Sequence, residues 1–177
     1  MIIVEGPDGA GKTQLVLRLA DELQVPVEPK VVQPDMSSEV DLLRWSSDQI
    51  RGWPEKKIYD RFPLISEFIY GPIFKHNVRT PFKDFAELRI LHDNFRAAQP
   101  VIIYCLPPVT EVLANVSRDD TDNSAVNSPA IHGVYWAYHN LAASSYGVVW
   151  DYTIPQSYEL MLQHVKSQSY RRNYLEY

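Results

Sequence analysis

The chain has 177 residues, a formal net charge of −5, and hydrophobic and charged fractions of 45% and 22%. These values are typical of a globular protein that buries a sizeable core without disulfides or metals, and they exclude the basic surface of a protein that wraps nucleic acid. The longest apolar run, about six residues, is too short for a membrane span, and no basic leader precedes the first strand. We therefore expect one cytoplasmic domain over residues 1–177.

The first stretch predicts a strand, a glycine-rich turn and a helix. Ile2–Glu5 is an apolar run, residues 6–13 read GPDGAGKT, and residues 14–23 carry apolar side chains at helical spacing. This pattern matches GxxxxGK[ST], in which glycines let successive backbone N–H groups point inward and hold phosphate oxygens at the helix N-terminus. An accidental match is expected in about one chain in a hundred of this length. The stretch therefore predicts nucleotide binding.

The loop also supplies side chains suited to ATP and Mg²⁺. We expect Lys12 to be exposed and to place its charge on the β- and γ-phosphates, and the Thr13 hydroxyl to ligate Mg²⁺. The other predicted nucleotide contacts in this stretch are Gly6, Asp8, Gly9, Ala10, Gly11 and Gln14.

The next segment predicts a strand, a loop and a helix. The strand covers residues 25–32 and leads into Gln33-Pro34. The helix follows Ser38-x-x-Asp41, which is typical of a capping box, and its predicted buried face carries Val40, Leu43, Ser47 and Ile50.

A third strand, residues 56–60, ends at Asp60-Arg61. Ligands of open parallel sheets collect at the carboxyl ends of strands, so both side chains are candidate site residues. A short helix follows, which we expect to end at Gly71-Pro72. Its apolar positions are Leu64, Ile65, Phe68 and Ile69.

The second half of the chain continues this alternation. Thr80-Pro81 predicts the start of a helix with Phe85, Leu88, Leu91 and Phe95 buried. Residues 101–106 predict a central strand in which Cys105 is a buried hydrophobe. Further segments are helices at 109–116, 131–145 and from 155 onward, a strand at 148–152, and a mobile polar loop at 117–129. Five alternating strands predict an α/β doubly wound fold, with a five-stranded parallel sheet and helices on both faces.

The pairing of residues 6–13 with Tyr59-Asp60-Arg61-Phe62 resembles the thymidylate kinase branch of the nucleoside and nucleotide kinases, in particular its compact virus-encoded members. The resemblance extends more weakly to the strand before Pro107-Pro108 and to the strand and helix of residues 148–165. It implies ATP on the phosphate loop, an acceptor pocket across the sheet, and a flexible lid over about residues 117–130.

This resemblance also implies roles for single residues. Asp60 orients the acceptor or, together with Thr13, binds Mg²⁺. Arg61 binds phosphate. Ala10 stands where some relatives have a basic residue, so Arg118 is the predicted lid arginine. The implied catalytic residues are Lys12, Asp60, Arg61 and Arg118, and the implied acceptor contacts are Asp8, Phe62, Phe68 and Tyr70.

The favoured function is transfer of the ATP γ-phosphate to a deoxynucleoside monophosphate, with a thymidylate-like acceptor. The alternatives are a deoxynucleoside kinase, a kinase acting on a modified base or an end of DNA, and a non-catalytic nucleotide-binding module. The acidic charge disfavours a polymer, although a basic and aromatic patch near the C-terminus suits single-stranded nucleic acid or a homodimer contact. The patch consists of Lys166, Tyr170, Arg171, Arg172 and Tyr174.

Overall fold

The computed structural model describes residues 1–29, 42–52, 56–74, 85–119 and 128–173. These residues form five strands and seven helices, and the strands belong to one parallel sheet in the order β2-β3-β1-β4-β5. The predicted α/β fold is confirmed. The chain divides into two units, residues 1–5 with 13–100, and residues 6–12 with 101–177.

The first unit contains three parallel strands. β1 (Ile2–Glu5) pairs with β3 (Ile58–Asp60) with Val4 opposite Asp60, and β2 (Val27–Glu28) pairs along the other side of β3. Parallel pairing brings the carboxyl ends of these strands to one edge. Glu28 and Asp60, which end β2 and β3, therefore lie at the same edge.

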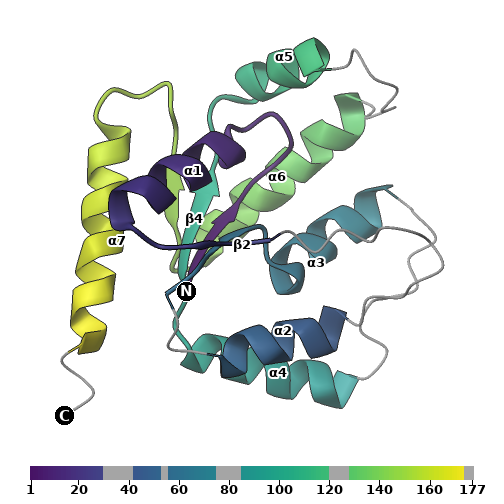
Figure 1. Cartoon of the computed structure of the whole chain (residues 1–177). Helices are drawn as coiled ribbons and strands as arrows, with labels where there is room; N and C mark the ends of the chain where they lie inside the picture. Colours follow the sequence, from purple (N-terminus) through teal and green to yellow (C-terminus); the bar gives the residue numbers. More distant parts are fainter. Residues whose placement is uncertain (30–41, 53–55, 75–84, 120–127, 174–177) are drawn as a thin grey trace. The chain divides into compact units, whose positions relative to one another are not determined.

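The helices of the first unit are α1 (Lys12–Leu23), α2 (Leu42–Arg51), α3 (Pro63–Phe74) and α4 (Phe85–Ala97). α2 packs against α4 and lies beside it in Figure 1. An aromatic cluster joins the helices to β3: the rings of Phe62 and Phe95 stack at 5.4 Å, and Tyr59 and Trp45 contact Phe62 edge-on or tilted. This cluster forms one wall of the region where β3 ends.

The second unit pairs β4 (Val101–Cys105) with β5 (Val148–Trp150) in parallel. Its helices are α5 (Val109–Asp119), α6 (Ser128–Ser144) and α7 (Ser157–Asn173); α5 packs on α6, and α7 packs on β5. The predicted burial of Cys105 is confirmed, and α7 has a buried apolar face that consists of Tyr158, Met161, Leu162 and Val165.

Several predicted boundaries are wrong. α3 continues through Gly71-Pro72 to Phe74, because a proline disrupts the turn before it without preventing a further turn. α5 extends to Asp119, and α6 begins at Ser128, so both ends of the predicted loop are helical. Arg118 is thus a helical residue. On α2, the predicted burial of Ile50 is confirmed, and Leu42 and Ser46 are buried as well, whereas the predicted Ser47 is only partly buried.

Some predictions fall outside the described residues. They are the strand beyond residue 29, the capping box at 38–41, the helix start at Thr80-Pro81, the centre of the loop at 120–127, and Tyr174. The side chains of Leu43, Tyr170, Arg171 and Arg172 also lie outside the described part. Within the described part of the chain, every helix is too short or too polar to span a bilayer.

Candidate functional site

The phosphate loop, residues 6–12, belongs to the second unit. Gly6, Gly9 and Gly11 have φ of 144°, 78° and 78°, a region that favours glycine. A Cβ on Gly6 would lie 2.6 Å from the Cys105 carbonyl oxygen, so β4 also demands glycine there. The glycine pattern noted in the sequence therefore corresponds to real backbone requirements.

Lys12 is buried, not exposed as the sequence predicted. Its side chain is 6% exposed, and its Nζ donates a hydrogen bond to the Pro7 carbonyl oxygen at 2.5 Å. The Ala10 N–H also points to this oxygen, at 3.4 Å. The loop encloses the Lys12 side chain because the Lys12 ammonium donates a hydrogen bond to the Pro7 carbonyl, which faces the interior of the turn. Anionic oxygens bound in the turn would meet that ammonium directly.

The start of α1 brings a hydroxyl to the end of β3. Thr13 Oγ1 donates a hydrogen bond to Asp60 Oδ2 at 3.4 Å, and Asp60 is 8% exposed. A hydroxyl and a carboxylate are hard oxygen donors of the kind that Mg²⁺ prefers. The pair fits the predicted metal role of both residues. Gln14 is exposed, and Ala10 is fully buried, so Ala10 has only its backbone to offer a ligand.

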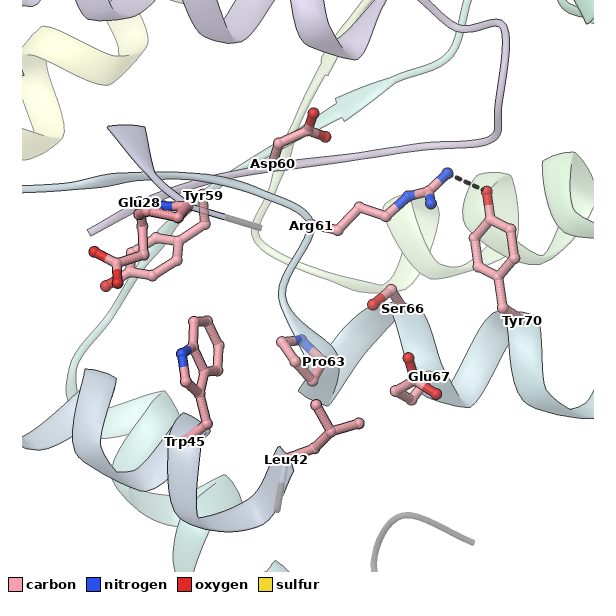
Figure 2. A pocket seen from close by; sticks show the side chains of 11 residues that line it. Glu28, Leu42, Trp45, Tyr59, Asp60, Arg61, Pro63, Ser66, Glu67 and Tyr70 are labelled. Atoms are coloured by element: carbon pink, nitrogen blue, oxygen red, sulfur yellow. Dashed lines mark hydrogen bonds between the residues drawn. The ribbon is translucent and has the colours of Figure 1, made fainter. Parts of the chain in front are cut away.

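A cavity of about 280 Å³ lies in the first unit at the carboxyl ends of β2 and β3 (Figure 2). It brings together three of the residues predicted for the acceptor site: Asp60, Arg61 and Tyr70. Asp8, also predicted there, belongs to the phosphate loop of the other unit. The described residues that line it are Glu28, Pro29, Leu42, Trp45, Tyr59, Asp60, Arg61, Pro63, Ser66, Glu67 and Tyr70.

Hydrogen bonds of both the backbone and the side chain fix the orientation of Arg61. Its φ is 72°, its N–H donates to the Val4 carbonyl at 2.9 Å, and the next N–H, of Phe62, donates to the buried carboxylate of Glu5 at 2.7 Å. The guanidinium Nη2 donates to the Tyr70 hydroxyl at 2.5 Å, and its carbon lies 4.4 Å from the centre of that ring. Figure 2 shows Arg61 reaching from the end of β3 toward Tyr70 on α3.

Acidic groups predominate in the lining. Glu28 is paired with Lys57 at 3.2 Å, and Glu67 lies on the same helix as Tyr70, three residues earlier. Burial raises the pKa of Glu67, and the positive charge of Arg61 lowers it by a smaller amount. With Asp60, the described residues of the lining include three carboxylates and one guanidinium. The pocket is therefore electrostatically unfavourable to a multiply charged anion.

The structure places two of the predicted acceptor contacts, Phe62 and Phe68, away from the cavity. Phe62 is completely buried in the aromatic cluster, and Phe68 is 52% exposed and does not line the cavity. The aromatic rings of the described lining are Trp45, Tyr59 and Tyr70, and the Tyr59 hydroxyl donates to Gln49 at 2.9 Å. Sequence reasoning missed Trp45 because a helical pattern predicts a buried face and does not show which neighbouring side chain lines a cavity.

Glu5 was also missed. It is a fully buried acid at the end of an apolar strand, which was the available clue to its structural role. Arg118 is exposed near the end of α5 and contacts Asn115 at 3.5 Å in the second unit. Among the described residues, no cluster of three or more histidine, cysteine or acidic side chains forms a metal site.

The chain is similar to solved structures of nucleotide-binding proteins. The YorR protein of Bacillus subtilis, in complex with phosphorylated GDP, matches over 97% of each chain with a TM-score of 0.71 and 17% sequence identity. Deoxyadenosine kinase from M. mycoides, with the products dCMP and a flexible dCDP bound, matches over 94% of this chain and 98% of that chain, with a TM-score of 0.62 and 16% identity. No protein-family model matches the chain, and neither does any curated protein sequence.

At these identities the likeness concerns the fold. The chain has the fold of the P-loop nucleotide kinases, with the five-stranded parallel sheet that the sequence predicted.

Proposed function

We propose that the protein is an ATP-dependent kinase that phosphorylates a hydroxyl group of a deoxynucleoside. The phosphate loop is the donor site, and the cavity at the ends of β2 and β3 is the acceptor site. The observation that carries the choice of acceptor is the excess of carboxylates over cations among the described residues that line that cavity. A neutral nucleoside enters such a pocket without the repulsion that a phosphate dianion would meet.

The remaining lining suits a sugar and a base. Tyr70 is fixed by its hydrogen bond from Arg61, so it can pack against a deoxyribose and crowd a 2′-hydroxyl. Trp45 offers an indole ring from α2, and such rings pack well against flat bases. The deoxyadenosine kinase that shares this fold acts, by its name, on a deoxynucleoside, which agrees with this choice.

In this proposal, four of the predicted residues keep the roles expected of them: Lys12, Thr13, Asp60 and Arg118. Lys12 breaks its hydrogen bond to the Pro7 carbonyl and neutralises charge on the donor phosphates. Arg118, as the lid arginine, binds the same phosphates. Thr13 and Asp60 would hold Mg²⁺, which supplies further neutralisation of phosphate charge when bound. The acceptor oxygen forms a bond to the γ-phosphorus as the bond to the bridging oxygen of ADP breaks, and a carboxylate of the pocket accepts the hydroxyl proton.

A deoxynucleoside monophosphate, of the thymidylate type, is the second candidate acceptor. Arg61 favours it, because a guanidinium fixed at the wall of a pocket can bind a phosphate through two hydrogen bonds. This acceptor would need Arg61 to outweigh the repulsion from Glu28 and Glu67.

An acceptor panel tests the proposal. The enzyme is given ATP and Mg²⁺ with thymidine and other deoxynucleosides, their monophosphates, a ribose analogue and a short oligonucleotide, and ADP release is followed. We expect a deoxynucleoside to have a higher kcat/KM than its own monophosphate. In the Glu67→Gln variant, the kcat/KM values for the deoxynucleoside and for its monophosphate should differ less.

Faster turnover of a monophosphate would favour the second candidate, and turnover of the oligonucleotide alone would favour a kinase acting on DNA. Absence of ADP release with every acceptor would favour a non-catalytic nucleotide-binding module. Lys12→Ala serves as the inactive control.

A further inference from the structure

The side-chain amide of Asn115, on α5, contacts three separate segments of the second unit. Its Nδ2 donates to the Gly9 carbonyl at 2.9 Å and to the Tyr152 hydroxyl at 2.9 Å. Its Oδ1 accepts a bond from Arg118 Nη1 at 3.5 Å. A side-chain amide has two N–H donors and one carbonyl acceptor, so both ends of this group are engaged.

Gly9 sits directly on α5, where a larger residue would not fit. A Cβ on Gly9 would lie 2.7 Å from the Val112 carbonyl oxygen and 2.9 Å from a methyl carbon of Val116. The phosphate loop is therefore seated on this helix by close packing, with Asn115 as a polar contact at the same place.

The bond to Asn115 fixes the direction of a peptide group. In a trans peptide the C=O and the following N–H point in opposite directions. With the Gly9 carbonyl turned toward Asn115, the Ala10 N–H points away from it, and it reaches the Pro7 carbonyl at 3.4 Å. Lys12 Nζ bonds the same Pro7 oxygen, so the Ala10 N–H and the ammonium converge on one point inside the loop.

We propose that Asn115 is a positioning residue for the donor nucleotide, whose amide holds the Gly9–Ala10 peptide so that the Ala10 N–H faces the phosphates. The inference rests on donor binding at the phosphate loop, as in the proposed function. Gly9 has a φ of 78°, and glycine tolerates rotation of its peptide. Without Asn115 the peptide can rotate and present a carbonyl oxygen to the phosphates, which repels them.

Two variants separate positioning from packing. Asn115→Ala removes the amide, whereas Asn115→Asp keeps its size but cannot donate to the Gly9 carbonyl. Calorimetric titration with MgADP should give affinities in the order wild type, Ala, Asp, with Ala weaker than wild type by about three- to tenfold, the loss expected for one hydrogen bond. Glu111→Ala, exposed one turn earlier on α5, is the matched control and should bind as wild type. An Asp variant that binds as wild type would mean that Asn115 only fills space, and the inference would be overturned.

A second readout needs no nucleotide. Amide hydrogen exchange over residues 6–13 of the ligand-free protein should be about three- to tenfold faster in Asn115→Ala than in Glu111→Ala. Unchanged exchange overturns the inference, whatever the titration shows. Wild-type protein that binds no MgADP would instead contradict the proposed function, so the two failures are distinguishable.

Discussion

Arg61 has a backbone conformation that costs free energy in a residue with a side chain. Its φ of 72° is in the left-handed region, where such a residue is disfavoured by about 1–3 kcal/mol. Along a regular strand, successive side chains point to opposite faces. The turn at Arg61 breaks that alternation, and both Asp60 and Arg61 line the cavity. The hydrogen bonds from the backbone to Val4 and Glu5 offset the strain.

Lys12→Ala should lower kcat by about a hundredfold or more, because an ammonium that neutralises transition-state charge is lost. The fold should survive: the Pro7 carbonyl keeps its contact with the Ala10 N–H, so the loss of stability is about 1 kcal/mol. Steady-state kinetics and thermal melting measure the two effects. Arg18→Ala, which removes a positive charge from the exposed face of the same helix, is the control. A Lys12→Ala enzyme with more than about a tenth of wild-type kcat would contradict the role.

Glu67→Gln should stabilise the protein at neutral pH and not below pH 4.5. Burial raises the pKa of Glu67 above its ordinary value of 4.5 in the folded state, so folding favours the protonated form. That contribution to stability is fully present below the unfolded pKa and is lost as the pH rises through the folded pKa. Glutamine, which is always neutral, avoids the loss. Urea unfolding of both proteins at pH 4 and pH 7 measures the difference, and Glu111→Gln shows the effect of replacing an exposed glutamate. An equal difference at both pH values would contradict the prediction.

At the scale of elements, most of the fold could be predicted because the signals are local. Apolar runs identify β1 and β4, and helical spacing identifies the buried faces of α1 and α7. The end of α3 was misplaced because packing sustains a helix past a proline. On α2, Ile50 is buried as predicted, but the completely buried Ser46 was missed because a serine carries little hydrophobic signal.

The same limit applies to the site. The glycines of residues 6–11 lie close together in the sequence, and Asp60 and Arg61 are neighbours. Both motifs could therefore be recognised. Trp45 and Glu67 reach the cavity only through the packing of α2 and α3, which no local pattern encodes. Phe62 was assigned to the base because an aromatic residue after Asp60-Arg61 suits both a pocket and a core, and only tertiary contacts with Trp45 and Phe95 decide between them.

The turn into β5 depends on a glycine for steric reasons. A Cβ on Gly147 would lie 2.3 Å from Cε2 of Tyr104 and 3.0 Å from the Ile102 carbonyl oxygen. Tyr104 is 1% exposed, and its hydroxyl accepts a bond from Ser145 at 3.1 Å, so its ring has little freedom to move away. Gly147→Ala should therefore destabilise the protein by about 2 kcal/mol or more, which lowers Tm by roughly 4–8 °C.

Gly52→Ala is the matched control at the end of α2. Its Cβ would have nearest neighbours at 3.4 and 3.7 Å, which is ordinary van der Waals contact. We expect a change within about 1 kcal/mol. Equal melting temperatures for the two variants would show that β4 and β5 adjust freely around Tyr104.

At the scale of the whole molecule, charge decides which acceptors can approach. The net charge of −5 repels a polyanion at long range, and nucleic-acid binding draws most of its affinity from phosphate contacts with lysine and arginine. Lys166 is exposed on α7, but it is one cation against this overall field. Single-stranded DNA should therefore bind only weakly.

Fluorescence anisotropy with a labelled oligonucleotide, at about 50 and 200 mM salt, measures this binding. We expect a Kd weaker than about 100 µM at the higher salt, at the weak end of nonspecific binding. A Kd in the low micromolar range that weakens steeply with salt would contradict the prediction and favour a kinase acting on DNA. Lys166→Glu would then locate the contact: loss of binding would place the DNA on the patch of residues 166–174, and unchanged binding would place it elsewhere on the chain. Because a nucleoside is uncharged, its turnover should change little over the same salt range. The salt dependence of turnover or binding therefore distinguishes a nucleoside acceptor from a DNA acceptor.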